Sequence, residues 1–208
     1  MYKKVLIVLC MFLLVGCNKI DLESMSFDEI IDSGINTKIE TSNVNAKGYR
    51  YFLPNEFTLI KDSDYVQELL SHGNMYYLNI DVVSYYYKNI IKVEHEYEDY
   101  EYFTFEKDDK NGYLKIRKNN DYFFVEICYN YAIIEVEVES SELRYAISRS
   151  IAILNSIKYN DLVIEKFIHN SDIDSSETVY KLPEPKNKNE TKNILEYIEE
   201  YDYEEEES

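Results

Sequence analysis

The stretch YAIIEVEVESSELRYAISRSIAILNSIKY, residues 131–159, decides the fold class because its apolar pattern changes period near Ser140. Before that residue, apolar and acidic side chains alternate, which is typical of a strand with one buried and one solvated face. The side chains predicted to point inward are Ile134, Val136 and Val138, and those predicted to point outward into water are Glu135, Glu137 and Glu139.

After Ser140 or Ser141, either of which suits an N-cap, apolar residues recur every three or four positions. This period predicts an amphipathic helix that packs across the sheet. A strand that leads into such a helix is typical of an α+β domain, in which helices cover one antiparallel layer. The apolar stripe of the helix consists of Leu143, Ala146, Ile147, Ser150, Ile151 and Leu154.

Upstream of this stretch, short alternating or aromatic segments separated by turn residues predict an antiparallel β-meander. Residues 48–54 and 56–61 are expected to form one hairpin, and Asn111-Gly112 is expected to form the turn of another. We predict a single α+β domain over residues 26–182, an α/β sandwich with helices over the sheet. Its strands are predicted at residues 48–54, 56–61, 74–88, 101–107, 112–118, 121–128 and 131–139, with one more at 162–168.

Two shorter helices are predicted within the same domain. The first covers residues 27–33, because Ser26 and Glu29 have capping-box spacing and Gly34 is a common helix stop. The second covers residues 64–72. Its expected caps are Ser63 and Gly73.

The first twenty residues, MYKKVLIVLCMFLLVGCNKI, have the layout of a secretory signal peptide. The apolar run over residues 5–15 is too short to cross a bilayer as a helix, because about 20 residues are needed. The run ends in Leu14-Val15-Gly16-Cys17, which resembles the bacterial lipobox L-[AVSTI]-[GAS]-C. That resemblance implies cleavage before Cys17 and attachment of palmitate-type acyl chains to this cysteine.

On this interpretation residues 1–16 are a signal peptide and residues 17–25 are a lipidated tether. Two or three acyl chains hold a protein stably on a membrane. We therefore expect a lipid-anchored protein on the extracytoplasmic face of a bacterial cell membrane. An uncleaved N-terminal anchor with an incidental cysteine is the alternative that the sequence leaves open.

The composition bounds the partners of the 208-residue chain. A net charge of −18 and a pI of about 4.5 argue against binding of nucleic acid. Anionic lipid headgroups would also repel such a chain, so any membrane affinity must come from the lipid anchor. Residues 183–208 are acidic and are predicted to be disordered, with a partner-docking helix as the alternative. Cys128 is expected to be a buried thiol without a disulfide partner, because Cys10 and Cys17 belong to the N-terminal segment.

Two further segments carry a weaker resemblance. YRYFLPNEF (residues 49–57) and SRSIAILNSIKYN (residues 148–160) resemble the opening and the closing helix of PsbP/Mog1-type domains. The Trp usual after the first Pro of those domains is missing, since the chain has no Trp. The resemblance implies an antiparallel sheet between helices and a tendency to bind or assist assembly, and it assigns no site residue.

No catalytic, metal-binding or cofactor-binding motif stands out. The three histidines lack zinc-site spacing, and residues 171–177 lack the Gly and Glu of a calcium loop. The best candidate for a ligand site is a carboxylate on a tyrosine-rich sheet face, formed by Tyr77, Asp81 and Tyr85. The alternative is that Asp81 is only hydrogen-bonded at the sheet surface.

These observations favour a non-enzymatic module of the cell envelope that binds, or helps to assemble, an envelope protein near the membrane. The alternative is a small-ligand or carbohydrate-binding lipoprotein that uses the tyrosine-rich face. An envelope hydrolase is least favoured, because it would need a convergent acid, base or nucleophile set in one cleft.

Overall fold

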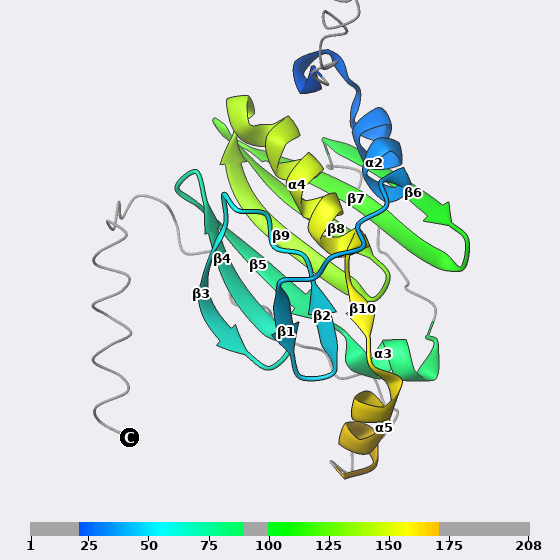
Figure 1. Ribbon diagram of the computed structural model, residues 1–208. Helices are drawn as coiled ribbons and strands as arrows, with labels where there is room; N and C mark the ends of the chain where they lie inside the picture. The colour runs from blue at the N-terminus through cyan, green and yellow to red at the C-terminus, as the bar shows by residue number, and fades with distance from the viewer. Residues whose placement is uncertain (1–20, 90–99, 171–208) are drawn as a thin grey trace, which may run out of the picture.

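The computed structural model describes residues 21–89 and 100–170, and it confirms the α+β class with antiparallel sheets (Figure 1). The larger sheet has seven strands in the order β3-β4-β5-β9-β8-β7-β6, and the smaller has three in the order β1-β2-β10. The strands of the larger sheet are β3 (Thr58–Ser63), β4 (Val66–Ser71), β5 (Asn74–Ile80), β6 (Glu101–Lys107), β7 (Lys110–Asn119), β8 (Tyr122–Tyr129) and β9 (Ala132–Glu139). Those of the smaller are β1 (Val44–Ala46), β2 (Tyr49–Tyr51) and β10 (Lys158–Tyr159).

The larger sheet consists of two meanders, β3-β4-β5 and β6-β7-β8-β9, which are joined by the antiparallel pairing of β5 with β9. In this register Leu78 of β5 lies opposite Ile134 of β9, which lies opposite Ile127 of β8. All three side chains are fully buried. The alternation predicted for residues 131–139 therefore places a continuous apolar layer on one face of the sheet.

Two helices cover that face, as Figure 1 shows: α4 (Leu143–Asn155) contacts β8 and β9, and α2 (Phe27–Asn36) packs on α4. The short 3₁₀ helices η1 (Leu22–Ser24) and η2 (Ser140–Glu142) precede them. The predicted α4 is confirmed. Its predicted apolar stripe is buried at every position.

The helix α2 begins as predicted and ends later than predicted. Ser26 and Glu29 form the capping box, but the helix continues through Gly34 to Asn36. A Cβ atom at position 34 would overlap the side chain of Ile151 on α4, so this glycine serves close helix packing. The final carbonyls of α2 are capped by Asn155, whose Nδ2 donates to Gly34 O at 3.0 Å and Thr37 O at 2.8 Å.

The predicted helix over residues 64–72 is wrong, because this segment forms β4 and a hairpin turn. Side chains on β4 alternate between the two faces, and Gln67, Leu69 and Ser71 are buried on the helix-covered side. His72 and Gly73, with φ of 50° and 74°, form the two-residue turn to β5. Positive φ at both positions is the geometry that matches the twist of hairpin strands.

Several strand pairings also differ from the prediction. The segment 48–54 contributes β2, which pairs with β1 and β10, whereas β3 pairs with β4. The β6–β7 turn is formed by Asp108-Asp109, and Gly112 lies inside β7, where a Cβ would overlap the Phe105 ring. The strand predicted at 162–168 is the helix α5 (Asp161–Asn170).

The strand predicted over residues 74–88 is wrong beyond Ile80. Asp81 caps the short helix α3 (Val82–Tyr87), and its Oδ1 accepts a hydrogen bond from the Ser84 N–H at 2.8 Å. The helix ends at Lys88, whose φ of 55° is left-handed. The signal peptide (residues 1–16), Cys17, His95, residues 171–177 and the acidic tail (183–208) lie outside the described residues.

Candidate functional site

The structure separates the three residues predicted to share a ligand-binding face. Tyr77 lies on β5 and pairs with Glu135, so it belongs to the sheet face opposite the helices. Asp81 and Tyr85 lie one turn apart at the start of α3, where the Tyr85 N–H donates to Asp81 O at 3.0 Å. A common sheet face is therefore wrong, because the chain turns into a helix at Asp81. A ligand-binding role for these residues stays a prediction.

Tyr85 is the centre of a tyrosine cluster, which we define as Tyr85, Tyr131 and Tyr159. The Tyr85 and Tyr159 rings are stacked, with centroids 3.8 Å apart and planes at 23°. The Tyr131 ring meets Tyr85 edge-on, with centroids 5.7 Å apart and planes at 82°. The three rings come from α3, the β8–β9 turn and β10, which meet at one end of the larger sheet (Figure 1).

Backbone geometry fixes Tyr131 in this cluster. Asn130 and Tyr131 form the β8–β9 turn with φ of 53° and 63°, and glycine is the residue usually favoured at the second position. A non-glycine residue in this left-handed region costs roughly 1–2 kcal/mol. The Asp81 N–H donates to Tyr131 O at 2.9 Å and so ties the turn to the start of α3. The turn therefore holds Tyr131 in a fixed position beside the start of α3.

A lysine lies over the tyrosine cluster. The Lys88 Nζ is 3.6 Å from the Tyr85 ring centroid and 5.9 Å from the Tyr131 centroid. Within residues 21–89 and 100–170, no carboxylate forms an ion pair with this ammonium. The ammonium contacts the faces of the Tyr85 and Tyr131 rings, through the attraction of a cation to the negative face of a ring.

Three carboxylates act on the rings of the cluster, those of Asp161, Asp109 and Asp81. The Tyr85 hydroxyl donates to Asp161 Oδ1 at 2.7 Å. Burial, the hydrogen bond to Asp161 and the charge of Asp161 raise the pKa of Tyr85 to about 12. Burial and the charges of Asp109 and Asp81 also raise the pKa of Tyr131. The phenols stay neutral at physiological pH, and the negative potential around them favours a cation.

A second polar cluster runs across the sheet face opposite the helices. Consecutive register partners form one line through all seven strands, and we call this line the polar row. Most of its members are at least partly buried. Its members are Lys61, Glu68, Tyr77, Glu135, Glu126, Lys115 and Tyr102.

The centre of the polar row holds a carboxyl pair, Glu126 and Glu135. Glu135 is only 8% exposed, so the prediction that it faces water is wrong. Burial, followed by the charge of Glu126, raises the pKa of Glu135 to about 7. The Tyr113 hydroxyl donates a hydrogen bond to Glu126 Oε1 at 2.6 Å. Glu135 can therefore hold a proton near neutral pH.

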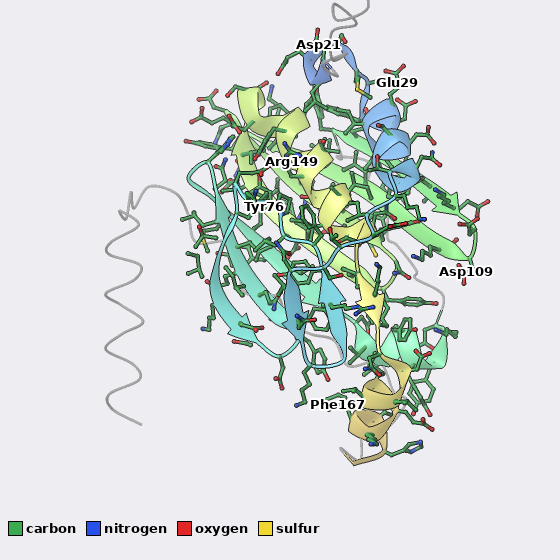
Figure 2. All side chains as sticks on the ribbon, in the orientation of Figure 1. Asp21, Glu29, Tyr76, Asp109, Arg149 and Phe167 are labelled. Carbon is green, nitrogen blue, oxygen red and sulfur yellow. The ribbon has the colours of Figure 1, made fainter. Side chains whose placement is uncertain are left out.

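A third cluster lies on the helix-covered side, in the region that Figure 2 marks with Tyr76 and Arg149. The Arg149 Nε forms an ion pair with Glu56 Oε1 at 2.7 Å. His72 stacks on Tyr145 with centroids 4.3 Å apart, and its Nδ1 lies 3.0 Å from Glu142 Oε2. The His72 contacts hold the β4–β5 turn against η2 and α4, and the Arg149 ion pair holds the segment before β3 against α4, so the cluster has a structural role.

In the described part of the chain, no three His, Cys, Asp or Glu side chains are grouped closely enough to hold a metal ion. None of the helices described there has both the length and the apolar character needed to cross a membrane. Comparisons with protein-family models, curated proteins and solved structures find no match for the chain.

Proposed function

We propose that this protein is a membrane-anchored extracytoplasmic lipoprotein that acts as a non-enzymatic binding or assembly module of a bacterial cell envelope. The observation that carries the proposal is the lipobox Leu14-Val15-Gly16-Cys17 directly before a folded domain. Asp21, which caps η1, is four residues after Cys17. Four peptide units reach about 15 Å at most whatever their conformation, so a lipid on Cys17 would keep the domain beside the membrane.

The first described residues are held firmly to the domain, which gives the proposed anchor a direction. The Arg144 Nε of α4 donates to Met25 O at 3.0 Å, and its guanidinium lies over the Phe27 ring at 5.3 Å. Figure 1 shows η1 and the start of α2 at one end of the molecule, and α3 and α5 at the other. Anchoring through Cys17 would therefore present the tyrosine cluster away from the membrane.

The partner in the leading proposal is an envelope protein close to the membrane. The resemblance to PsbP/Mog1-type domains, with helices over an antiparallel sheet, supports binding or assembly as the activity of the domain at residues 26–182. The second candidate is a small-ligand or carbohydrate-binding lipoprotein. The tyrosine cluster favours this alternative, because aromatic rings beside a carboxylate can both stack on a small ligand and hydrogen-bond to it.

The test is the intact mass of the protein extracted from membranes. We expect the mass of residues 17–208 plus two or three acyl chains, and loss of the added mass in Cys17→Ser. Cys128→Ser is the matched control, because Cys128 is a buried free thiol and its replacement should leave lipidation unchanged. An unlipidated or full-length wild-type mass would overturn the proposal. A lipidated mass would justify crosslinking at the membrane to capture the partner.

A further inference from the structure

We propose that the tyrosine cluster is a binding site for a ligand's ammonium group, with quaternary ammonium preferred, and that Lys88 occupies this site in the free protein. The proposal rests on the binding function proposed above and names the chemistry of one ligand class. It is carried by the position of the Lys88 ammonium, 3.6 Å from the Tyr85 centroid.

The cluster has the shape of a cation site. The Tyr85 and Tyr131 rings stand at 82° to each other and form a corner, and the Lys88 Nζ lies within 6 Å of both centroids. Tyr159 and Lys88 both lie less than 4 Å from the Tyr85 centroid, so they must take opposite faces of that ring. The ring is thus supported from behind by Tyr159 and offers its other face to a cation.

The supporting contacts hold the rings in place without a ligand. The Tyr85 hydroxyl is bonded to Asp161, and the Tyr159 hydroxyl donates to Asn130 O at 2.7 Å in the turn that carries Tyr131. Rings that are fixed before binding lose little conformational entropy on binding. Lys88, in contrast, is an exposed side chain at the end of a short helix, so its ammonium can leave the site.

Charge and solvation determine which cation fits. Asp161 accepts a hydrogen bond from the Tyr85 hydroxyl, and the negative charges of Asp109 and Asp81 act on Tyr131. The site therefore lies in a negative electrostatic potential. The tip of the hairpin that carries Asp109 is marked in Figure 2. No carboxylate of the described chain pairs with the Lys88 ammonium, so recognition is by ring faces. Ring faces favour quaternary ammonium groups, which carry no N–H group that needs a hydrogen-bond acceptor.

The experiment is calorimetric titration of the full lipidated chain, in non-ionic detergent, with choline as the probe. The neutral isostere 3,3-dimethyl-1-butanol has the same shape without the charge and is the ligand control. We expect Lys88→Ala to bind choline about two- to five-fold more tightly than wild type, since removal of the resident ammonium frees a contact of that strength. Tyr85→Leu should weaken binding to the Lys88→Ala background at least five-fold.

Matched variants separate the site from general effects. Lys47→Ala removes the same charge from a lysine that lies 5.2 Å over the Phe167 ring on α5, and it should leave choline affinity unchanged. Tyr85→Phe keeps the ring and should retain most of the binding, which guards against misfolding of Tyr85→Leu.

Three results would overturn the inference: no choline binding by Lys88→Ala, equal binding of the neutral isostere, or equal tightening by Lys47→Ala. Any of these, found in a protein whose mass shows lipidation, would remove the ligand class and leave the anchored module standing.

Discussion

The two faces of the seven-stranded sheet are built from alternate residues of the same strands, yet they are held together by different forces. On the helix-covered face, Leu78, Ile134 and Ile127 form a fully buried apolar line beneath α4. One residue along each strand, on the opposite face, lies the polar row. Apolar burial tolerates any partner of suitable size, whereas buried carboxyl groups depend on specific hydrogen bonds and on protonation. The helix-covered face should therefore contribute most of the free energy of unfolding. The polar row should determine how that free energy changes with pH.

The largest expected effect comes from two neighbouring isoleucines of β9 that point to opposite faces. Ile134→Ala removes a fully buried side chain and should lower the free energy of unfolding by about 3–4 kcal/mol. Ile133→Ala makes the same chemical change on the polar-row side, where the residue is half-buried, and should cost about 1 kcal/mol. Urea unfolding of both variants measures the difference. Equal costs would show that the two faces contribute alike.

The next effect tests the helix layer itself. Gly34→Ala places a Cβ against Ile151 and should separate α2 from α4 at a cost of about 2 kcal/mol, even after the better helix propensity of alanine is counted. In the background Ile151→Ala, the same change should be neutral or stabilising, because the overlapping side chain is gone. A double-mutant cycle by thermal unfolding measures this coupling. Additive effects would contradict the close contact.

The smallest effect concerns the polar row. The folded-state pKa of Glu135 is raised from 4.5 to about 7, so the protein holds this proton more tightly than the unfolded chain does. The resulting stabilisation is fully present below pH 4.5 and is lost as the pH rises through 7. Relative to Glu135→Gln, the wild type should therefore lose about 2 kcal/mol of unfolding free energy between pH 5 and pH 7.

The control for this pH dependence is Glu137→Gln, on the same strand and the same face but opposite Phe124 in the register. This variant should keep the pH dependence of the wild type. Denaturant unfolding at several pH values compares the three proteins. Parallel curves for wild type and Glu135→Gln would exclude a buried proton at position 135.

Local patterns were sufficient to predict the stretch that joins β9 to α4 and the capping box of α2. In these places the period and the cap residues act within one element. The pattern failed at residues 64–72, where helix-favouring Gln, Glu and Leu residues form β4 because strand pairing on both sides outweighs propensity. It also failed at Glu135, which is buried between Tyr77 of β5 and Glu126 of β8, two residues that no local pattern connects to it.

The candidate site was predictable only in part, for the same reason. A carboxylate among tyrosines predicted a ligand site at Asp81 and Tyr85. The pattern could not place them, because an aspartate before an apolar run suits a strand as well as a helix N-cap. No sequence pattern assigns the other members of the site, Tyr131, Tyr159 and Lys88. They come from separate parts of the sequence and meet only because a turn, a short strand and a helix end lie side by side. A tyrosine at a position that prefers glycine is evident only from the backbone angles.

The pairing of β5 with β9 also sets the order in which the protein can be completed. As the chain is extended from its N-terminus, β3, β4 and β5 can pair with one another, but the second edge of β5 has no partner until residues 132–136 of β9 are present. Until then β5 is an open edge with Tyr76 and Leu78 uncovered, and α4, which shields that face, follows later still. Antiparallel edges of this kind are sites where chains associate wrongly. Strands β3–β5 are therefore the part of this protein most exposed to wrong association until β9 has formed.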